Sequence, residues 1–219
     1  MADAPTLTRT HPLEAWRPAF TALSDGMGRT DLAIELLPLT AALDVRIEPG
    51  TDGATAVADL LGVPLPASPN TWTSISDGRA VWLGPDEWLL TGAAASDEES
   101  VRAVVGPHGG TAVDVSAQRT GVRLRGRDAR RLLAFGCALD LRPASFPPGS
   151  CAQTLLGQSG VLLLADREGD GPDSAVLDVV VRCSFAGYVA GWLLDAAEEL
   201  RPIPAGPVTD STDQEGDGT

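Results

Sequence analysis

Few residues in this chain are able to carry nucleophilic, acid–base or metal chemistry. Its two histidines, His11 and His108, lie in an N-terminal arm and in a Pro-His-Gly-Gly turn, where a histidine-based site would need a better-supported neighbour. There is no lysine at all, which excludes the lysine of a phosphate-binding loop and Schiff-base chemistry. We therefore expect no catalytic centre built on histidine or lysine.

The carboxylates are also poorly placed for catalysis. Asp86 and Glu87 are adjacent, and neighbours on a strand point to opposite faces, so they are not expected to work as a pair. Asp114 is expected to cap the turn that contains Ser116 through a local hydrogen bond to the backbone. Arg119 is suited to anchoring a carboxylate, and an internal salt bridge is favoured over a foreign carboxylate.

Cysteine usage gives no metal or disulfide framework. Cys137, Cys151 and Cys183 are an odd number without Cys-x-x-Cys spacing. Each lies beside apolar neighbours, which is typical of buried, reduced thiols in a cytosolic protein. No metal site is expected.

Composition narrows the possible partners. The chain of 219 residues has 30 acidic against 16 basic residues, a formal net charge of −14, and 43% apolar residues. A nucleic-acid partner is not expected, because neutralising phosphates requires a basic face. The sequence has no secretory signal pattern and no apolar run of the length that spans a bilayer, so no membrane association and a cytoplasmic location are expected.

Hydrophobic periodicity predicts a mixed α+β fold. Leu43, Val45 and Ile47 alternate with charged residues, as in a half-buried strand. Leu13, Trp16 and Phe20 predict a short amphipathic turn or an apolar arm, with packing on the chain's own core favoured over contact with a partner. Gly136 is expected to be a left-handed helix cap. Further strands are expected at 72–75, 80–83, 88–90, 122–125, 152–156, 161–164 and 175–182, and helices at 56–61, 97–105, 128–135 and 186–200.

The pattern repeats once along the chain. A strand, a glycine, a helix, two or three strands and a second helix occur at about 40–110 and again at about 111–200. We expect two pseudo-repeated β-α-β-β-α units, mostly antiparallel with helices packed on the sheets, in a single two-lobed domain over 13–201. Residues 1–12 are expected to be a flexible arm and 202–219 a disordered acidic tail.

Four blocks in order carry a family resemblance: WLGPDEWLL, VDVSAQRTGVRLRG, LLAFGCALDLRPASFPPGSCAQTLLGQSGVLL and RCSFAGYVAGWLLDAAEEL. Over about residues 80 to 200 they resemble the gamma subunit of heterotetrameric sarcosine oxidase. More weakly, they resemble the folate-binding aminomethyltransferase of the glycine cleavage system, whose fold the resemblance implies. When 159–162 are laid on that family's G-G-I-x turn, Leu163 and Leu164 occupy the place of its acidic pair, so no catalytic or cofactor-binding residue is carried over.

The resemblance implies a noncatalytic subunit of a flavin-dependent complex. That complex would oxidatively demethylate sarcosine to glycine, with hydrogen peroxide and formaldehyde or 5,10-methylenetetrahydrofolate as the other products. Alpha and beta partners would hold FAD, FMN, NAD and the folate site, and a delta partner would hold zinc. The alternative is an independent folate-binding, aminomethyltransferase-like enzyme.

A partner-binding patch is expected on tryptophans or on a proline loop. Trp82 and Trp88 flank the turn 83–87, where core packing is the favoured role and anchoring of a partner the alternative. The loop formed by Phe146, Pro147 and Pro148 is the second candidate.

Overall fold

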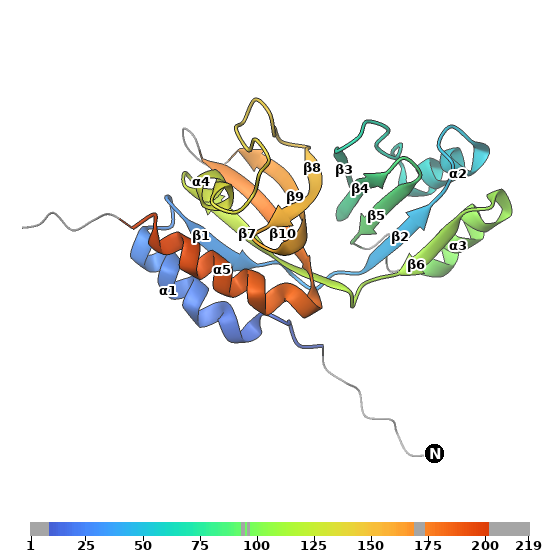
Figure 1. Ribbon diagram of the computed structural model, residues 1–219. Helices are drawn as coiled ribbons and strands as arrows, with labels where there is room; N and C mark the ends of the chain where they lie inside the picture. Colours follow the sequence, from blue (N-terminus) through green and yellow to red (C-terminus); the bar gives the residue numbers. More distant parts are fainter. Residues whose placement is uncertain (1–8, 93–94, 96, 169–173, 202–219) are drawn as a thin grey trace, which may run out of the picture.

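The computed structural model describes residues 9–92, 95, 97–168 and 174–201. They form two five-stranded sheets that lie next to one another (Figure 1). Sheet A has the strand order β1-β7-β10-β9-β8 and sheet B the order β3-β4-β5-β2-β6. Every strand pairing in them is antiparallel, and helices cover both sheets, so the predicted α+β class is confirmed.

The strands are short, and most of them lie where alternation or apolar runs predict them. Those of sheet A are β1 (Ala33–Leu36), β7 (Arg119–Gly126), β8 (Cys151–Leu156), β9 (Ser159–Glu168) and β10 (Ala175–Arg182). Those of sheet B are β2 (Ala42–Arg46), β3 (Trp72–Ile75), β4 (Gly78–Gly84), β5 (Glu87–Thr91) and β6 (Thr111–Asp114).

Each sheet receives its edge strand from across the pseudo-repeat. β1 pairs with β7 in the sheet of the second half, and β6 pairs with β2 in the sheet of the first half. The sheet boundary therefore comes after β6, four residues beyond the division expected near residue 110. The chain crosses between the sheets twice, through 37–41 and 115–118, which ties the two sheets together covalently.

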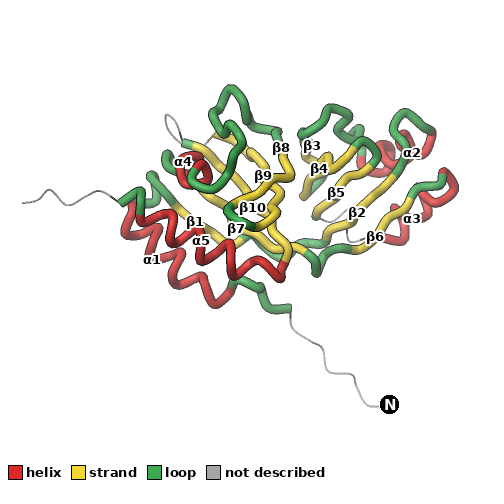
Figure 2. The backbone as a smooth tube through the Cα atoms, in the orientation of Figure 1, coloured by secondary structure: helices red, strands yellow, loops and turns green. Residues whose placement is uncertain are grey.

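The helices pack on the outer faces of the two sheets. They are α1 (Arg17–Met27), α2 (Asp52–Leu61), α3 (Glu98–Val105), α4 (Ala129–Ala134) and α5 (Ala186–Glu198). α1, α4 and α5 share a core with one face of sheet A, and α2 and α3 share a separate core with sheet B (Figure 2). In the part of the chain that the structure describes, no helix is long and apolar enough to cross a membrane.

The N-terminal apolar residues belong to the core of sheet A. Leu13 and Phe20 are each only 1% exposed, and both pack among the residues of α4 and α5. Packing on the chain's own core, the favoured prediction, is confirmed for these two side chains. The helix is longer than the short turn predicted, and Gly28 ends it at a positive φ of 86°.

Local side-chain chemistry explains where two other helices begin. The Thr51 hydroxyl accepts a hydrogen bond from the Ala54 N–H at the start of α2, and the Asp97 carboxylate accepts one from the Ser100 N–H at the start of α3. Gly62 ends α2 in the left-handed conformation. Helix starts and ends are thus set by residues whose types signal them in the sequence.

The prediction for Gly136 is wrong. α4 ends at Phe135 in the right-handed region, and Gly136 does not have a positive φ. A Cβ there would lie 2.4 Å from Trp192 Cζ2 and 3.0 Å from Gly157 N, so the glycine permits a close approach between α4, α5 and the β8–β9 turn. Close packing, and not backbone handedness, accounts for this residue.

Candidate functional site

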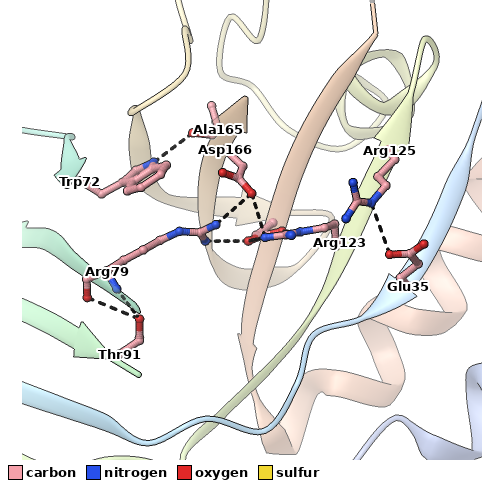
Figure 3. Close-up of polar contacts among 9 residues, drawn as sticks. Glu35, Trp72, Arg79, Thr91, Arg123, Arg125, Ala165 and Asp166 are labelled. Atoms are coloured by element: carbon pink, nitrogen blue, oxygen red, sulfur yellow. Dashed lines mark hydrogen bonds and ion pairs between the residues drawn. The ribbon is translucent and has the colours of Figure 1, made fainter. Parts of the chain in front are cut away.

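A cluster of two arginines and two aspartates connects the two sheets (Figure 3). Asp178 on β10 accepts hydrogen bonds from Arg123 on β7, at 2.6 Å from Nε and 2.7 Å from Nη2. It also accepts one from Arg79 Nη1 on β4 of sheet B, at 2.7 Å. Asp166 lies within 3.0 Å of Nη2 of both arginines. Two positive and two negative charges therefore balance within one network.

Strand register positions this cluster. Arg123 and Asp178 are directly opposite one another in the antiparallel pairing of β7 and β10. Residues that alternate along a strand share a face, so Arg123 points away from the helices that cover Val122 and Leu124 and toward sheet B. Asp178 is only 1% exposed, and its hydrogen bonds raise the pKa of Arg123, with burial acting against this.

Trp72 covers the end of the ion cluster that belongs to sheet B. The Arg79 guanidinium lies 4.6 Å from the centroid of the Trp72 ring, which is cation–π distance. The indole N–H donates a hydrogen bond of 3.0 Å to the Ala165 carbonyl on sheet A (Figure 3). Trp72 therefore makes a cation–π contact with an arginine of sheet B, its own sheet, and a hydrogen bond to the backbone of sheet A.

The ion cluster forms one wall of a cavity between the sheets, with a volume of about 430 Å³. Apolar side chains from both sheets line it, among them Val81, Leu89, Leu164 and Val180. Arg119 lines it as well, and also borders a shallower hollow of about 310 Å³ that includes Arg182. A largely apolar cavity with a few charged groups of both signs has the composition of a small-molecule site.

The sequence prediction for Arg119 is not met. No ion pair joins Arg119 to a carboxylate of the described residues, and its Nε is buried without a hydrogen-bond partner. Burial, and then the positive charge of Arg182, lower the pKa of Arg119, whereas the charges of Asp44 and Glu87 act in the opposite direction. The favoured internal salt bridge is therefore wrong, and the alternative of a foreign carboxylate remains.

The residues expected to contact a partner do not form one patch. Trp88 is 2% exposed in the core of sheet B, where its indole N–H donates to the Pro66 carbonyl at 2.9 Å. Phe146 is 6% exposed in the core of sheet A, and Trp82 is half-buried. Pro147 and Pro148 are exposed. Only the two prolines present most of their surface, and their contact with a partner stays a prediction.

His11 and Asp114 have local structural roles. The Asp114 carboxylate accepts a 2.7 Å hydrogen bond from the Ser116 N–H, as expected for a turn cap, and the Ser116 side chain, followed by this backbone bond, lowers the pKa of Asp114. His11 Nδ1 accepts from the Leu13 N–H, so its Nε2 carries the proton of the neutral ring and lies 3.0 Å from the Leu37 carbonyl. Burial lowers the pKa of His11. This histidine attaches residues before α1 to the crossing segment.

The thiols and carboxylates of the described residues assemble no metal centre. No group of three histidine, cysteine or carboxylate side chains converges within the ranges that the structure describes. Cys137 and Cys151 are buried, Cys183 is half-buried, and all three are free thiols. The predicted burial is confirmed for Cys137 and Cys151, whereas Cys183 is less buried than predicted.

Comparison with known proteins identifies the family. The model of the sarcosine oxidase gamma subunit family matches residues 48–199. The sarcosine oxidase subunit gamma of Corynebacterium sp. (strain U-96) is 32% identical over 178 residues, covering 79% of this chain and 82% of the relative. This chain belongs to the sarcosine oxidase gamma subunit family. The corresponding Arthrobacter sp. subunit is 30% identical, with coverage of 82% of this chain and 86% of that protein.

Solved structures agree with membership of this gamma subunit family. A chain of the heterotetrameric sarcosine oxidase from Corynebacterium sp. U-96, in complex with pyrrole 2-carboxylate, matches with a TM-score of 0.79 and 29% identity. The match covers 90% of this chain and 99% of that one. The aminomethyltransferase T of the glycine cleavage system from Bartonella henselae matches with a TM-score of 0.52 and 12% identity, covering 78% of this chain and 48% of that protein. The second likeness shows a shared fold.

The two leucines that stand in place of the expected acidic pair are core residues in this member of the gamma subunit family. Leu163 is fully buried among the helices of sheet A, and Leu164 is 3% exposed between the sheets, beside the cavity. They lie inside β9, because the preceding hairpin turn is formed by Gly157 and Gln158 and β9 already begins at Ser159. Hydrocarbon side chains at these positions have no proton to exchange.

Sequence reasoning missed the ion cluster. Arg79 on β4 is far in the chain from Arg123 and from Asp166 and Asp178 on the consecutive strands β9 and β10, and only the fold brings the four together. One signal was present, because Asp178 interrupts the otherwise apolar run from Ala175 to Val181. A charged residue in such a run predicts a buried partner of opposite charge.

Proposed function

We propose that this chain is a noncatalytic, structural subunit of a heterotetrameric, flavin-dependent sarcosine oxidase. The complex would oxidatively demethylate sarcosine to glycine, yielding hydrogen peroxide and either formaldehyde or 5,10-methylenetetrahydrofolate. Alpha, beta and delta subunits would be the partners, with FAD, FMN, NAD, zinc and the folate site in those subunits. This chain would have a structural role in the assembly.

One observation carries the proposal. The structural match to a chain of a heterotetrameric sarcosine oxidase extends over 99% of that chain and 90% of this one, so it is a match of whole subunits and not of a shared module. The burial of Leu163 and Leu164 adds support, because these positions cannot supply the carboxylates of an aminomethyltransferase-like active site.

An exposed apolar surface supports a role in assembly. Phe135 is 49%, Leu155 60% and Tyr188 43% exposed. Phe135 and Tyr188 lie near the β8–β9 turn, because Gly157 N donates to the Gly136 carbonyl and the Tyr188 hydroxyl lies 2.9 Å from Gln158 N. Leu155 comes just before the same turn, on the face of edge strand β8 that is turned away from α4 and α5. Exposed aromatic and aliphatic side chains around one turn are favoured at subunit contacts. This surface differs from the tryptophan patch expected from the sequence, and it is the region that we expect to contact a larger subunit.

Co-expression tests the proposed function. The chain with an affinity tag, expressed together with the candidate alpha, beta and delta chains, should retain them through size-exclusion chromatography in a stable complex. The double substitution of Leu155 and Tyr188 by serine should weaken retention, whereas Leu60→Ser, a change of an exposed leucine on α2, should leave it unchanged. A tagged chain that stays alone beside folded partners would contradict the proposal. Calorimetric titration of the isolated chain with tetrahydrofolate should show no binding, and micromolar binding would favour an independent folate enzyme.

A further inference from the structure

We propose that Arg119 and Arg182 form a binding site for a monoanionic carboxylate in the hollow of about 310 Å³ that both of them line, next to the cavity between the sheets, which Arg119 also lines. The two residues are direct partners in the antiparallel pairing of β7 and β10, so both side chains lie on the face of sheet A that is turned toward sheet B. Like charges placed opposite one another on a sheet destabilise it. An anion bound between them would remove this repulsion.

Neither arginine has a counter-ion in the described chain. Arg119 and Arg182 make no ion pair with any described carboxylate, although most other described arginines do. The Nε–H of Arg119 is buried and donates to nothing. A buried donor without a partner loses the hydrogen bond that it makes with water in the unfolded chain, and a ligand oxygen would restore one to this group.

The nearest acidic residues are already engaged. Arg46 Nη2 lies 2.7 Å from Glu87 Oε2 and its Nε lies 3.8 Å from an oxygen of Asp44. Burial and the neighbouring Asp44 raise the pKa of Glu87. These two carboxylates therefore share one arginine of their own sheet and leave Arg119 without a direct contact.

The local charge indicates the class of ligand. Arg46, Arg119 and Arg182 against Asp44 and Glu87 leave one positive charge, which a carboxylate neutralises and a phosphate dianion overcompensates. The guanidinium fork matches a carboxylate with two parallel hydrogen bonds. The apolar lining of the cavity, which includes Val81, Leu89 and Val180, has space for a small hydrocarbon body.

The carboxylate could come from a free organic acid or from an acidic side chain of a partner subunit. Nuclear magnetic resonance of the arginine Nε–H groups in the full chain tests the first source with propionate as the probe. We expect saturable shifts of the Arg119 and Arg182 signals with propionate, about a tenfold weaker response of the Arg119 signal in R182Q, and no response of the Arg182 signal in R119Q. Propionamide, which lacks the charge, should not shift the Arg119 signal. Propionate should not shift the Arg29 signal, because Arg29 has its own partner in Asp25.

An acidic side chain of a partner subunit, the second possible source of the carboxylate, is tested by measuring assembly of the complex. Only this assembly measurement rests on the proposed function. If propionate has no effect on the free chain, R119Q should weaken assembly with the partner subunits at least tenfold, while R29Q assembles as the wild type does. A wild-type chain that fails to assemble counts against the proposed function. Absence of both the propionate response and the R119Q assembly defect overturns the carboxylate site, as does an equal response to propionamide or a stronger one to phosphate.

Urea unfolding distinguishes a role of Arg119 and Arg182 in binding a ligand from a role in stabilising the fold. Removing a buried charge that lacks a counter-ion relieves its desolvation and the repulsion by Arg182, so R119Q should unfold at the same or a higher urea concentration than the wild type. A clear shift to lower urea would show that Arg119 stabilises the fold itself and would overturn the proposal.

Discussion

Arg79 and Asp178 belong to different sheets, and their side chains meet at 2.7 Å in the cavity between them. Asp178 is also held by Arg123 on its own sheet, so a single buried carboxylate connects β4, β7 and β10. The interface between the sheets is otherwise apolar around Val81, Leu89 and Leu162. Apolar side chains account for most of the contact between the sheets, and the ion cluster fixes how the two sheets are positioned relative to one another.

Substitution of Asp178 by asparagine should destabilise the protein strongly. Arg79 and Arg123 would lose the more buried of the two carboxylates that they share, while Asp166 would remain. Breaking a buried ion pair in this way costs about 3–5 kcal/mol. Urea denaturation followed by tryptophan fluorescence measures the loss. Asp25→Asn is the matched control, because its pair with Arg29 is more than half exposed and is expected to contribute at most about 1 kcal/mol. A similar small effect for both variants would refute the role given to Asp178.

The sequence predicted most of the elements because they follow local rules. Alternation predicted β2, and strands were also expected at 72–75, 80–83 and 122–125, where β3, β4 and β7 lie. β1 was missed. It has only four residues, of which Ala33 and Ile34 are both buried, so it lacks the alternation that marks a strand exposed on one face. Its place at the edge of sheet A depends on pairing with β7, which is far away in the sequence.

The candidate site was much less predictable than the fold. Arg119 was identified as a carboxylate anchor, but whether an internal partner reaches it depends on how the two sheets pack. Trp88 flanks a turn that looks exposed in the sequence, yet strand alternation places its side chain on the helix-covered face of sheet B. Which face of a strand is covered is a property of the tertiary arrangement, and a single sequence does not contain it in readable form.

Trp88 should behave as a core residue when it is changed. Trp88→Ala removes a side chain that is 2% exposed and is expected to cost about 3–5 kcal/mol. Trp88→Phe keeps most of the ring volume and loses the hydrogen bond to the Pro66 carbonyl, so its cost should be much smaller. Thermal unfolding followed by circular dichroism ranks the two variants. Equal stability of the alanine variant and the wild type, together with loss of partner binding, would instead support the original interface role.

The three thiols should differ in reactivity. Burial raises the pKa of Cys151 to about 12, although its weak hydrogen bond to the Trp82 carbonyl acts in the other direction. At pH 8 only about one Cys151 in ten thousand is then a thiolate, the form that reacts. Cys183 is half-buried and should react with Ellman's reagent first. Cys183→Ser should abolish the fast phase, and a fast phase that persists in this variant would contradict the assignment.

Gly78 should tolerate no side chain, although its φ is not in the left-handed region. A Cβ there would lie 1.8 Å from the Thr91 carbonyl oxygen and 2.5 Å from the carbonyl carbon, both of which are backbone atoms of the paired strand and cannot move aside alone. Gly78→Ala should therefore cost more than the roughly 1–3 kcal/mol typical of overpacking. Gly106→Ala is the control, because its Cβ would meet nothing within 4 Å and its φ of −56° suits alanine. We expect that change to be neutral or to stabilise by up to about 1 kcal/mol. Urea titration of both variants measures the difference, and a Gly78→Ala protein as stable as Gly106→Ala would show that β4 and β5 are not paired this closely.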